Sequence, residues 1–128
     1  MSVRIVRLGS ERGSREGPRL GTVRHPPRGV PKSQHAKQNW YDVWLPELAP
    51  SAAAVKSARA AQNERQWSAF VKRYRREMNA PEPQRLLTLL GALSQQADFS
   101  VGCYCEDERR CHRSVLRALL AEHGARVA

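Results

Sequence analysis

The hydrophobic pattern of this chain changes character near residue 50. Before that point the apolar residues form short β-prone runs, so residues 3–8 predict a first strand and residues 22–24 a short second one. Between these runs, residues 9–21 carry a glycine at every fourth position and predict a long flexible loop. The aromatic run over residues 40–45 ends at a proline and predicts a buried segment.

Helical spacing begins after residue 50. Ser51 is a good N-cap for a helix over about 52–61, and Asn63 with Gln66 forms the capping-box pattern of a second helix. The second helix carries one apolar stripe, made of Trp67, Phe70, Val71, Tyr74 and Met78. Arg65, Lys72, Arg75 and Arg76 lie on another, basic face of the same helix.

The last third of the chain reads as helix, strand, loop and helix. Two prolines at positions 81 and 83 break the chain before a leucine-rich helix expected over about 84–96. Residues 99–104 predict a strand buried on both faces, and residues 105–110 a charged loop. The final helix is expected from residue 111 to 122 or 123, where Gly124 is a natural stop.

Strands that flank a helical middle favour an α/β fold. We expect one compact domain over residues 1–128, with a small, mainly parallel central sheet flanked by helices. The basic Gly- and Pro-rich stretch at about 9–38 is expected to form loops, because prolines lack the N–H donor and restrict their neighbours.

Charge adds a feature that the hydrophobic pattern does not show. The 128 residues include 22 Lys and Arg against 12 Asp and Glu, a formal net charge of +10, and 18 of those 22 are arginine. Residues 1–32 hold eight basic and two acidic side chains, so +6 of the +10 lies in one quarter of the chain. Arginine suits bidentate contact with phosphate or carboxylate. A solvated surface from an arginine-favouring genome is the plainer explanation, although such surfaces also attract nucleic acid without specificity.

Composition also bears on the cellular compartment in which we expect the protein. A hydrophobic fraction of 41% is too high for a wholly disordered chain, and no apolar run approaches the ~18 residues of a membrane-spanning helix. The N-terminus lacks the apolar stretch of a secretory signal, and three cysteines make a poor disulfide framework. We therefore expect a cytoplasmic protein with reduced thiols, away from membranes.

The segment 101–113 is the best candidate for chemistry, because it leaves a strand and enters a helix. Sites in open α/β sheets form beyond the carboxyl ends of strands. Cys111 would sit at the start of the helix, where the dipole and Arg109, Arg110 and Arg113 favour a thiolate, and His112 could carry protons. Alternatively, Cys111 continues the apolar stripe of Val115 and Leu119 and is simply a buried small hydrophobe.

Two more specific motifs, a phosphate-binding loop and a zinc site, fit this segment poorly. Cys103 and Arg109 have the C-x5-R spacing of phosphate-cradling loops, but three of the five intervening residues are carboxylates that would repel phosphate. A zinc site made of Cys103, Cys105, Cys111 and a histidine lacks the usual spacing within a ligand pair. Cys111 and His112 would also point about 100° apart on a helix, and His123 would lie about 17 Å further along it. The sequence therefore predicts neither a metal nor a cofactor.

Two segments resemble a known family. The first is Arg-His-Pro-Pro-Arg-Gly-Val-Pro-Lys at 24–32, followed by Leu-Ala-Pro-Ser at 48–51, and the second is 103–113 with its final Cys-His-Arg triplet. Both resemble the bacterial and archaeal domain of unknown function 488 family, whose aromatic helix fits Trp67, Phe70, Tyr74 and Glu77. The resemblance implies a compact α/β fold with a mainly parallel sheet, and no established activity.

The resemblance also bears on single residues. Members commonly carry a cysteine eight residues before the triplet, which here is Cys103. They often carry a glutamate two residues after that cysteine. This chain has Cys105 at that position, so its Glu106 is out of register by one residue. One branch of the family keeps the Pro-Arg-Gly segment but lacks the triplet. This makes Arg24, Arg28 and Lys32 stronger candidates than the cysteines for a role that all members share.

Two functional hypotheses follow. In the first, an enzyme-like site uses Cys111, His112, Arg113 and Cys103 as catalytic residues, while Arg12, Arg24, Arg28, Lys32 and Arg109 bind an anion such as a nucleotide or nucleic-acid phosphate. In the second, the chain is a non-catalytic nucleic-acid-binding module with structural cysteines, and its basic N-terminal quarter and the basic helix face contact the phosphates. The partners are thus a nucleic acid or a phosphate-bearing ligand in either case.

Overall fold

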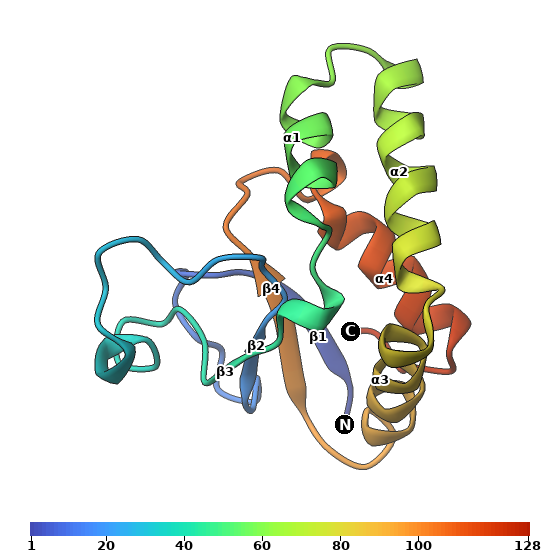
Figure 1. Ribbon diagram of the computed structural model, residues 1–128. Coiled ribbons are helices and arrows are strands. Elements are labelled where there is room, and N and C mark those ends of the chain that lie inside the picture. Colours follow the sequence, from blue (N-terminus) through green and yellow to red (C-terminus); the bar gives the residue numbers. More distant parts are fainter.

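The computed structural model describes residues 1–128 and contains one parallel sheet (Figure 1). Its strands are β1 (Val3–Arg7), β2 (Arg19–Gly21), β3 (Val43–Trp44) and β4 (Phe99–Cys103), in the order β1-β4-β2-β3. Every pairing is parallel, so β4 lies between β1 and β2 with all strands running the same way. The expected α/β fold with a small, mainly parallel sheet is confirmed.

Four helices pack around this sheet. They are α1 (Ala52–Ala60), α2 (Glu64–Met78), α3 (Pro81–Leu93) and α4 (His112–Glu122), and short 3-10 turns occur at Lys32–Gln34, Pro46–Leu48 and Glu108–Arg110. The helices gather on one side of the sheet and the long loops of the first 42 residues on the other, while α1 and α2 rise as a hairpin above the strand ends (Figure 1). No helix has the length and apolar character needed to cross a membrane.

The expected helix signals act as the sequence indicates. The Ser51 side chain accepts the N–H of Ala54, and the Asn63 side chain accepts the N–H of Gln66. The apolar stripe of α2 faces the main core, where Phe70 and Tyr74 are almost fully buried. These contacts pack α2 against α1, α3 and α4 and leave its basic face to solvent.

Three expectations about element positions are wrong. The second strand lies at 19–21 rather than 22–24, because Arg19 can enter the sheet as a fully buried partner of Glu16. Helix α3 begins at Pro81 and ends at Leu93, since a proline in the first helical turn gives up an N–H that has no helical partner anyway. The aromatic run at 40–45 is only partly buried, because its residues 43–44 form the edge strand β3.

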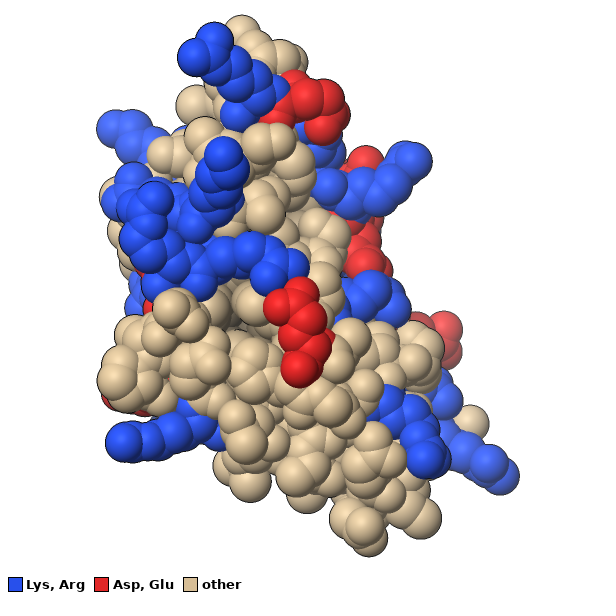
Figure 2. All heavy atoms as spheres, turned by 90° about the vertical axis from the view of Figure 1, so that its right-hand side faces the viewer, with Lys and Arg blue, Asp and Glu red and all other residues tan.

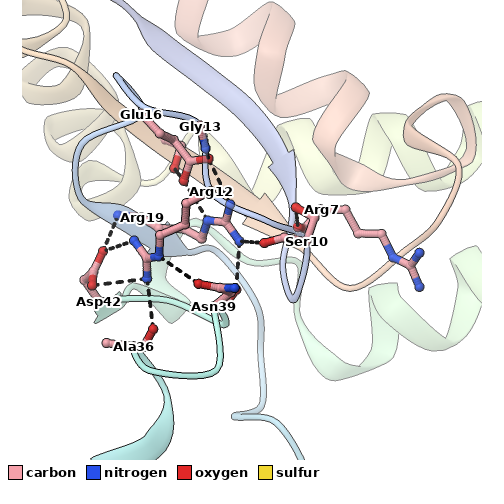
Figure 3. A network of polar contacts seen from close by, with 10 residues as sticks. Arg7, Ser10, Arg12, Gly13, Glu16, Arg19, Ala36, Asn39 and Asp42 are labelled. Atoms are coloured by element: carbon pink, nitrogen blue, oxygen red, sulfur yellow. Dashed lines mark hydrogen bonds and ion pairs between the residues drawn. The ribbon is translucent and has the colours of Figure 1, made fainter.

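A polar network holds the loop between β1 and β2 against the sheet (Figure 3). The guanidinium of Arg19 donates to Glu16 at 2.7 and 2.8 Å, and to the carbonyls of Ser10 and Asn39 at 2.9 and 2.7 Å. Glu16 also accepts the hydroxyl of Ser100 on β4 at 2.9 Å. The glycine-rich loop expected to be flexible is therefore tied to the sheet by buried charge-assisted bonds.

Candidate functional site

A large cavity lies at the carboxyl ends of the strands. It measures about 890 Å³ and is lined by residues directly after β1 (8–10), after β2 (23–28) and at the end of β4 (103–105). The start of α4 and parts of α1 and α2 complete its wall. Because the strands are parallel, their carboxyl ends share one edge, and the loops that follow them meet there. Cys103, Cys111, Arg24 and Arg28 thus line one cavity, as the parallel arrangement predicts.

The charge of this cavity comes mainly from arginine. Its lining includes five arginines and no aspartate or glutamate; the arginines are Arg7, Arg24, Arg28, Arg59 and Arg110. Arg7 and Arg110 pair with exposed carboxylates outside the lining, at 3.5 Å from Glu106 and 2.6 Å from Glu64. Arg24, Arg28 and Arg59 pair with no carboxylate. An anion entering the cavity would meet three uncompensated guanidinium groups.

Arg24 is held in place by the backbone. Its Nε donates to the carbonyl of Pro50 at 3.1 Å and its Nη2 to the carbonyl of Ala49 at 3.0 Å. Two of its five N–H donors are used in this way, so the rest of the planar group stays free to contact a ligand. The Pro-Arg-Gly segment and the Leu-Ala-Pro-Ser segment are therefore joined directly through this side chain.

Three cysteines and one histidine cluster on the cavity wall. Cys103 ends β4, Cys111 caps α4, and both are buried, whereas Cys105 is exposed. The sulfurs of Cys103 and Cys111 and a ring nitrogen of His112 all lie within 4.8 Å of one another. The neighbouring positions Cys111 and His112 contact each other directly, with Sγ and Nδ1 3.9 Å apart.

The three thiols of the cluster differ in their tendency to ionise. Contacts from the thiols of Cys103 and Cys111 lower the pKa of Cys105, so negative charge is favoured on this exposed sulfur. The contact with Cys103 acts to lower the pKa of Cys111, but the contact with Cys105 and burial outweigh it and raise that pKa to about 11. Burial and the neighbouring Cys105 sulfur therefore act against the thiolate expected at Cys111.

The imidazole of His112 is neutral and fixed in orientation. Burial lowers its pKa to about 4, although the bond to the Thr22 carbonyl acts in the opposite direction. Nε2 lies 2.8 Å from that carbonyl oxygen, and the ring meets Tyr74 edge-on with centroids 5.5 Å apart. His112 is therefore a partner of both the segment after β2 and the cysteine cluster.

Four residues predicted for the site lie outside the cavity lining. Arg12 forms a bidentate pair with Asp42 at 2.7 and 3.2 Å, where it ties the N-terminal loop to β3 (Figure 3). Lys32 sits on the exposed 3-10 turn, and the Arg109 side chain is 91% exposed and pairs with Asp107. Arg113 is buried behind the cluster, where its Nη2 donates to the Cys105 carbonyl at 2.6 Å.

Other residues enter the site without having been predicted. Arg7 and Arg59 line the cavity, as do Trp40, Tyr104 and Phe70, whereas Arg110, which also lines it, was already expected near the Cys111 thiol. Arg7 could have been found because it ends the strand whose carboxyl end forms the edge. Arg59 could not, since only the packing of the α1–α2 hairpin brings it to the cavity.

The fold and the cavity define a class: a small parallel α/β protein with an arginine-lined, cysteine-containing site at the carboxyl edge of its sheet. A family model supports a narrower placement, since residues 3–124 match DUF488-N3a, described as the active DUF488-N3 subclade. The chain belongs to this family, which agrees with the resemblance of its Pro-Arg-Gly and Cys-His-Arg segments. No curated protein and no solved structure matches the chain.

Proposed function

We propose that the protein is an enzyme whose cavity binds a phosphate-bearing ligand of the nucleotide class and brings it against Cys103, Cys111 and His112. The observation that carries this proposal is the lining itself. Five arginines and no carboxylate share one cavity with the whole cysteine cluster. The ligand is a free nucleotide or a nucleotide of a nucleic-acid chain.

The charge of the cavity supports a phosphate rather than a neutral ligand. Uncompensated guanidinium groups bind phosphate through paired N–H donors, and such charge-assisted bonds are about twice as strong as neutral ones. Arg24 is already oriented by two carbonyls, so little of its conformational freedom is lost when a ligand binds. Arg28 is exposed on the Pro-rich loop and can approach the same ligand from another side of the cavity.

The remaining lining suits a base and sugar. Trp40 and Tyr104 meet edge-on with centroids 5.8 Å apart, and Phe70 with several prolines extends this apolar wall. Aromatic faces stack with any nucleobase. The cavity volume of about 890 Å³ falls in the range of roughly 300–1,000 Å³ that is usual for small-molecule sites.

The catalytic roles fall to the cluster on the wall. Cys103, Cys111 and His112 line the cavity and would face the bound ligand. Arg113 does not reach the ligand; it acts as a positioning residue, since it holds the carbonyl of Cys105 from behind. Lys32 and Arg109 lie outside and would touch only a ligand that extends beyond the cavity, such as a nucleic-acid strand.

Titration calorimetry with adenosine triphosphate tests the binding step. Arg24→Gln and Arg28→Gln should each weaken binding by roughly 10-fold or more, because a hydrogen bond to a charged group contributes about 1.5–3 kcal/mol. Lys32→Gln is the matched control, a basic residue of the same loop region outside the lining, and should leave the Kd unchanged. Equal affinity in the wild type and in both arginine variants would refute the proposal.

A second candidate function rests on the outer face of α2. Arg65, Lys72 and Arg76 are exposed at helical spacing and pair with no carboxylate, whereas Arg75 pairs with Glu122 at 2.9 Å. Figure 2 shows Lys and Arg side chains gathered over the upper left of the face that carries α2, with the acidic side chains of the upper half lying mainly to their right. A non-catalytic nucleic-acid contact there predicts an affinity for single-stranded DNA that falls steeply with salt and is lost in Lys72→Gln/Arg76→Gln but kept in Arg24→Gln.

A further inference from the structure

We propose that Cys103, Cys111 and Nδ1 of His112 form a binding site for a zinc ion on the wall of the cavity. Their three potential ligand atoms lie within 4.8 Å of one another. Two come from the start of α4 and one from the end of β4, so the site joins the two elements that frame the cavity. The proposal is independent of whether the cavity binds a phosphate.

Local backbone geometry explains how adjacent residues can act together. On a helix, Cys111 and His112 would point about 100° apart, which argued against a shared metal. Cys111 is instead the N-cap of α4, with the extended angles φ −132° and ψ 152°. This conformation turns its sulfur back towards the ring of the first helical residue, to 3.9 Å from Nδ1. The objection that neighbouring side chains on a helix point too far apart to share a metal ion therefore does not apply to Cys111 and His112.

The hydrogen bond on the far side of the ring makes Nδ1 a ligand atom. A carbonyl oxygen only accepts, so Nε2 of His112 must carry the proton that is donated to Thr22 at 2.8 Å. In the neutral ring the lone pair then lies on Nδ1, which faces Cys111. Histidines that bind metals usually donate their other N–H to a carbonyl or carboxylate in this way.

The acceptor of that bond is itself rigid. Thr22 is fully buried, and both its N–H and its hydroxyl donate to the carbonyl of Gly102, at 3.0 and 2.9 Å. Gly102 precedes Cys103 on β4. The segment that orients the imidazole is thus fastened to the same strand that supplies a sulfur ligand.

The donor set selects the metal. Two sulfurs and one imidazole suit the borderline-soft zinc ion, whereas magnesium and calcium require oxygen ligands, and the cavity lining has no carboxylate. On binding, Zn²⁺ replaces the thiol protons of Cys103 and Cys111, and two protons are released without any redox change. Cys105 is exposed and lies outside this group of three, so the fourth position of a tetrahedral ion is open to water or to a ligand in the cavity.

The test uses the full chain under reducing conditions, stripped of metal by a chelator and titrated with Co²⁺ and Zn²⁺. We expect one equivalent of Co²⁺ with tetrahedral d–d bands and a sulfur-to-cobalt charge-transfer band, displaced by one equivalent of Zn²⁺. Cys103→Ser and Cys111→Ser should abolish stoichiometric binding, and His112→Ala should weaken it by about 10–100-fold or more. Cys105→Ser is the matched control and should still bind one equivalent.

Circular dichroism separates loss of metal from loss of fold. Zinc at a large excess over its Kd should raise the Tm of the wild type and of Cys105→Ser, but not that of a folded Cys111→Ser variant. A folded wild type that binds no stoichiometric Co²⁺, or a Cys105→Ser variant that alone loses the metal, would overturn the assignment. Adenosine triphosphate binding by the metal-free chain reports on the proposed function separately.

Discussion

The Nε2 atom of His112 lies 2.8 Å from the backbone oxygen of Thr22, and this bond ties the start of α4 to the segment that follows β2. Thr22 leads directly into the Pro-Arg-Gly segment, and His112 is the centre of the Cys-His-Arg triplet. The two sequence segments that characterise this chain therefore meet through a single side chain. Removing that side chain should affect both the stability and the shape of the cavity.

His112→Ala should lower the free energy of unfolding by about 2–3 kcal/mol, measured in urea with a chelator present. The variant leaves the Thr22 carbonyl without its imidazole donor and opens a gap beside Tyr74. His123→Ala is a useful comparison, because that histidine contacts only the end of α4 and Gln84, far from the cavity lining. A loss at His112 no larger than at His123 would contradict the coupling.

The buried pair of Arg19 and Glu16 should be the most costly ion pair to break. The two side chains are 0% and 4% exposed, so Arg19→Met leaves a carboxylate in the interior without its partner. We expect a loss of about 3–5 kcal/mol in the free energy of unfolding. Arg75→Met removes a pair whose side chains are 40% and 54% exposed and should cost less than about 1 kcal/mol. Similar losses in the two variants would contradict the role of the buried network.

Asp42 should make stability depend on pH in the acid range. Burial acts to raise the pKa of Asp42, but hydrogen bonds from Arg12 and the N–H of Arg19 outweigh it and lower that pKa. A carboxyl whose pKa is depressed on folding stabilises the protein above its unfolded pKa of about 3.9, and this contribution is lost as the pH falls through the folded pKa.

The comparison of wild type with Asp42→Asn measures this contribution. The difference in unfolding free energy should be about 1 kcal/mol near pH 6, because the Asp42 side chain is 34% exposed and solvent screens the pair. It should shrink as the pH is lowered below about 4. A difference that grows towards acid pH would reverse the sign and contradict the prediction.

Two glycines with nearly equal backbone angles should respond differently to alanine. Gly17 has φ +73° and Gly29 has φ +74°, so both substitutions cost about 1–2 kcal/mol for left-handed backbone. A Cβ at Gly17 would lie 2.0 Å from the carbonyl oxygen of Asp98, whereas one at Gly29 meets nothing within 4 Å. Gly17→Ala should therefore be clearly less stable than Gly29→Ala in thermal unfolding, and equal Tm values would contradict this reasoning.

Local signals in the sequence were sufficient for α1 and α2. The caps at Ser51 and Asn63 and the stripe of α2 are contacts within a few residues, so they can be read without tertiary structure. The position of β2 could not, because the burial of Arg19 depends on Glu16 and on Ser100, a residue 84 positions away from Glu16. In a pattern of hydrophobic and polar residues, the charged residues of a buried ion pair cannot be distinguished from charged residues at the surface.

The candidate site was partly predictable for a topological reason. Parallel strands deliver their following loops to one edge, which is why Arg24, Arg28 and the cysteines share a cavity. Arg12 was expected there too, but its partner Asp42 lies 30 residues away and nothing in the spacing pairs them. The protonation of the cluster also depends on three sulfurs brought together by the fold, which a reading of Cys111 alone could not anticipate.

The pairing of β1 with β4 has a consequence for the synthesis of the chain. Val3 pairs with Phe99, so β1 cannot find its neighbour until a residue 96 positions further along the chain has left the ribosome. The strand ends that frame the cavity, and with them the cysteine cluster, then assemble late and together, since contacts so distant along the chain form slowly. A nascent fragment would expose its arginine-rich loops long before the cysteines of the site were made, and the reactive half of the site would form only after β4 and the start of α4 had been synthesised.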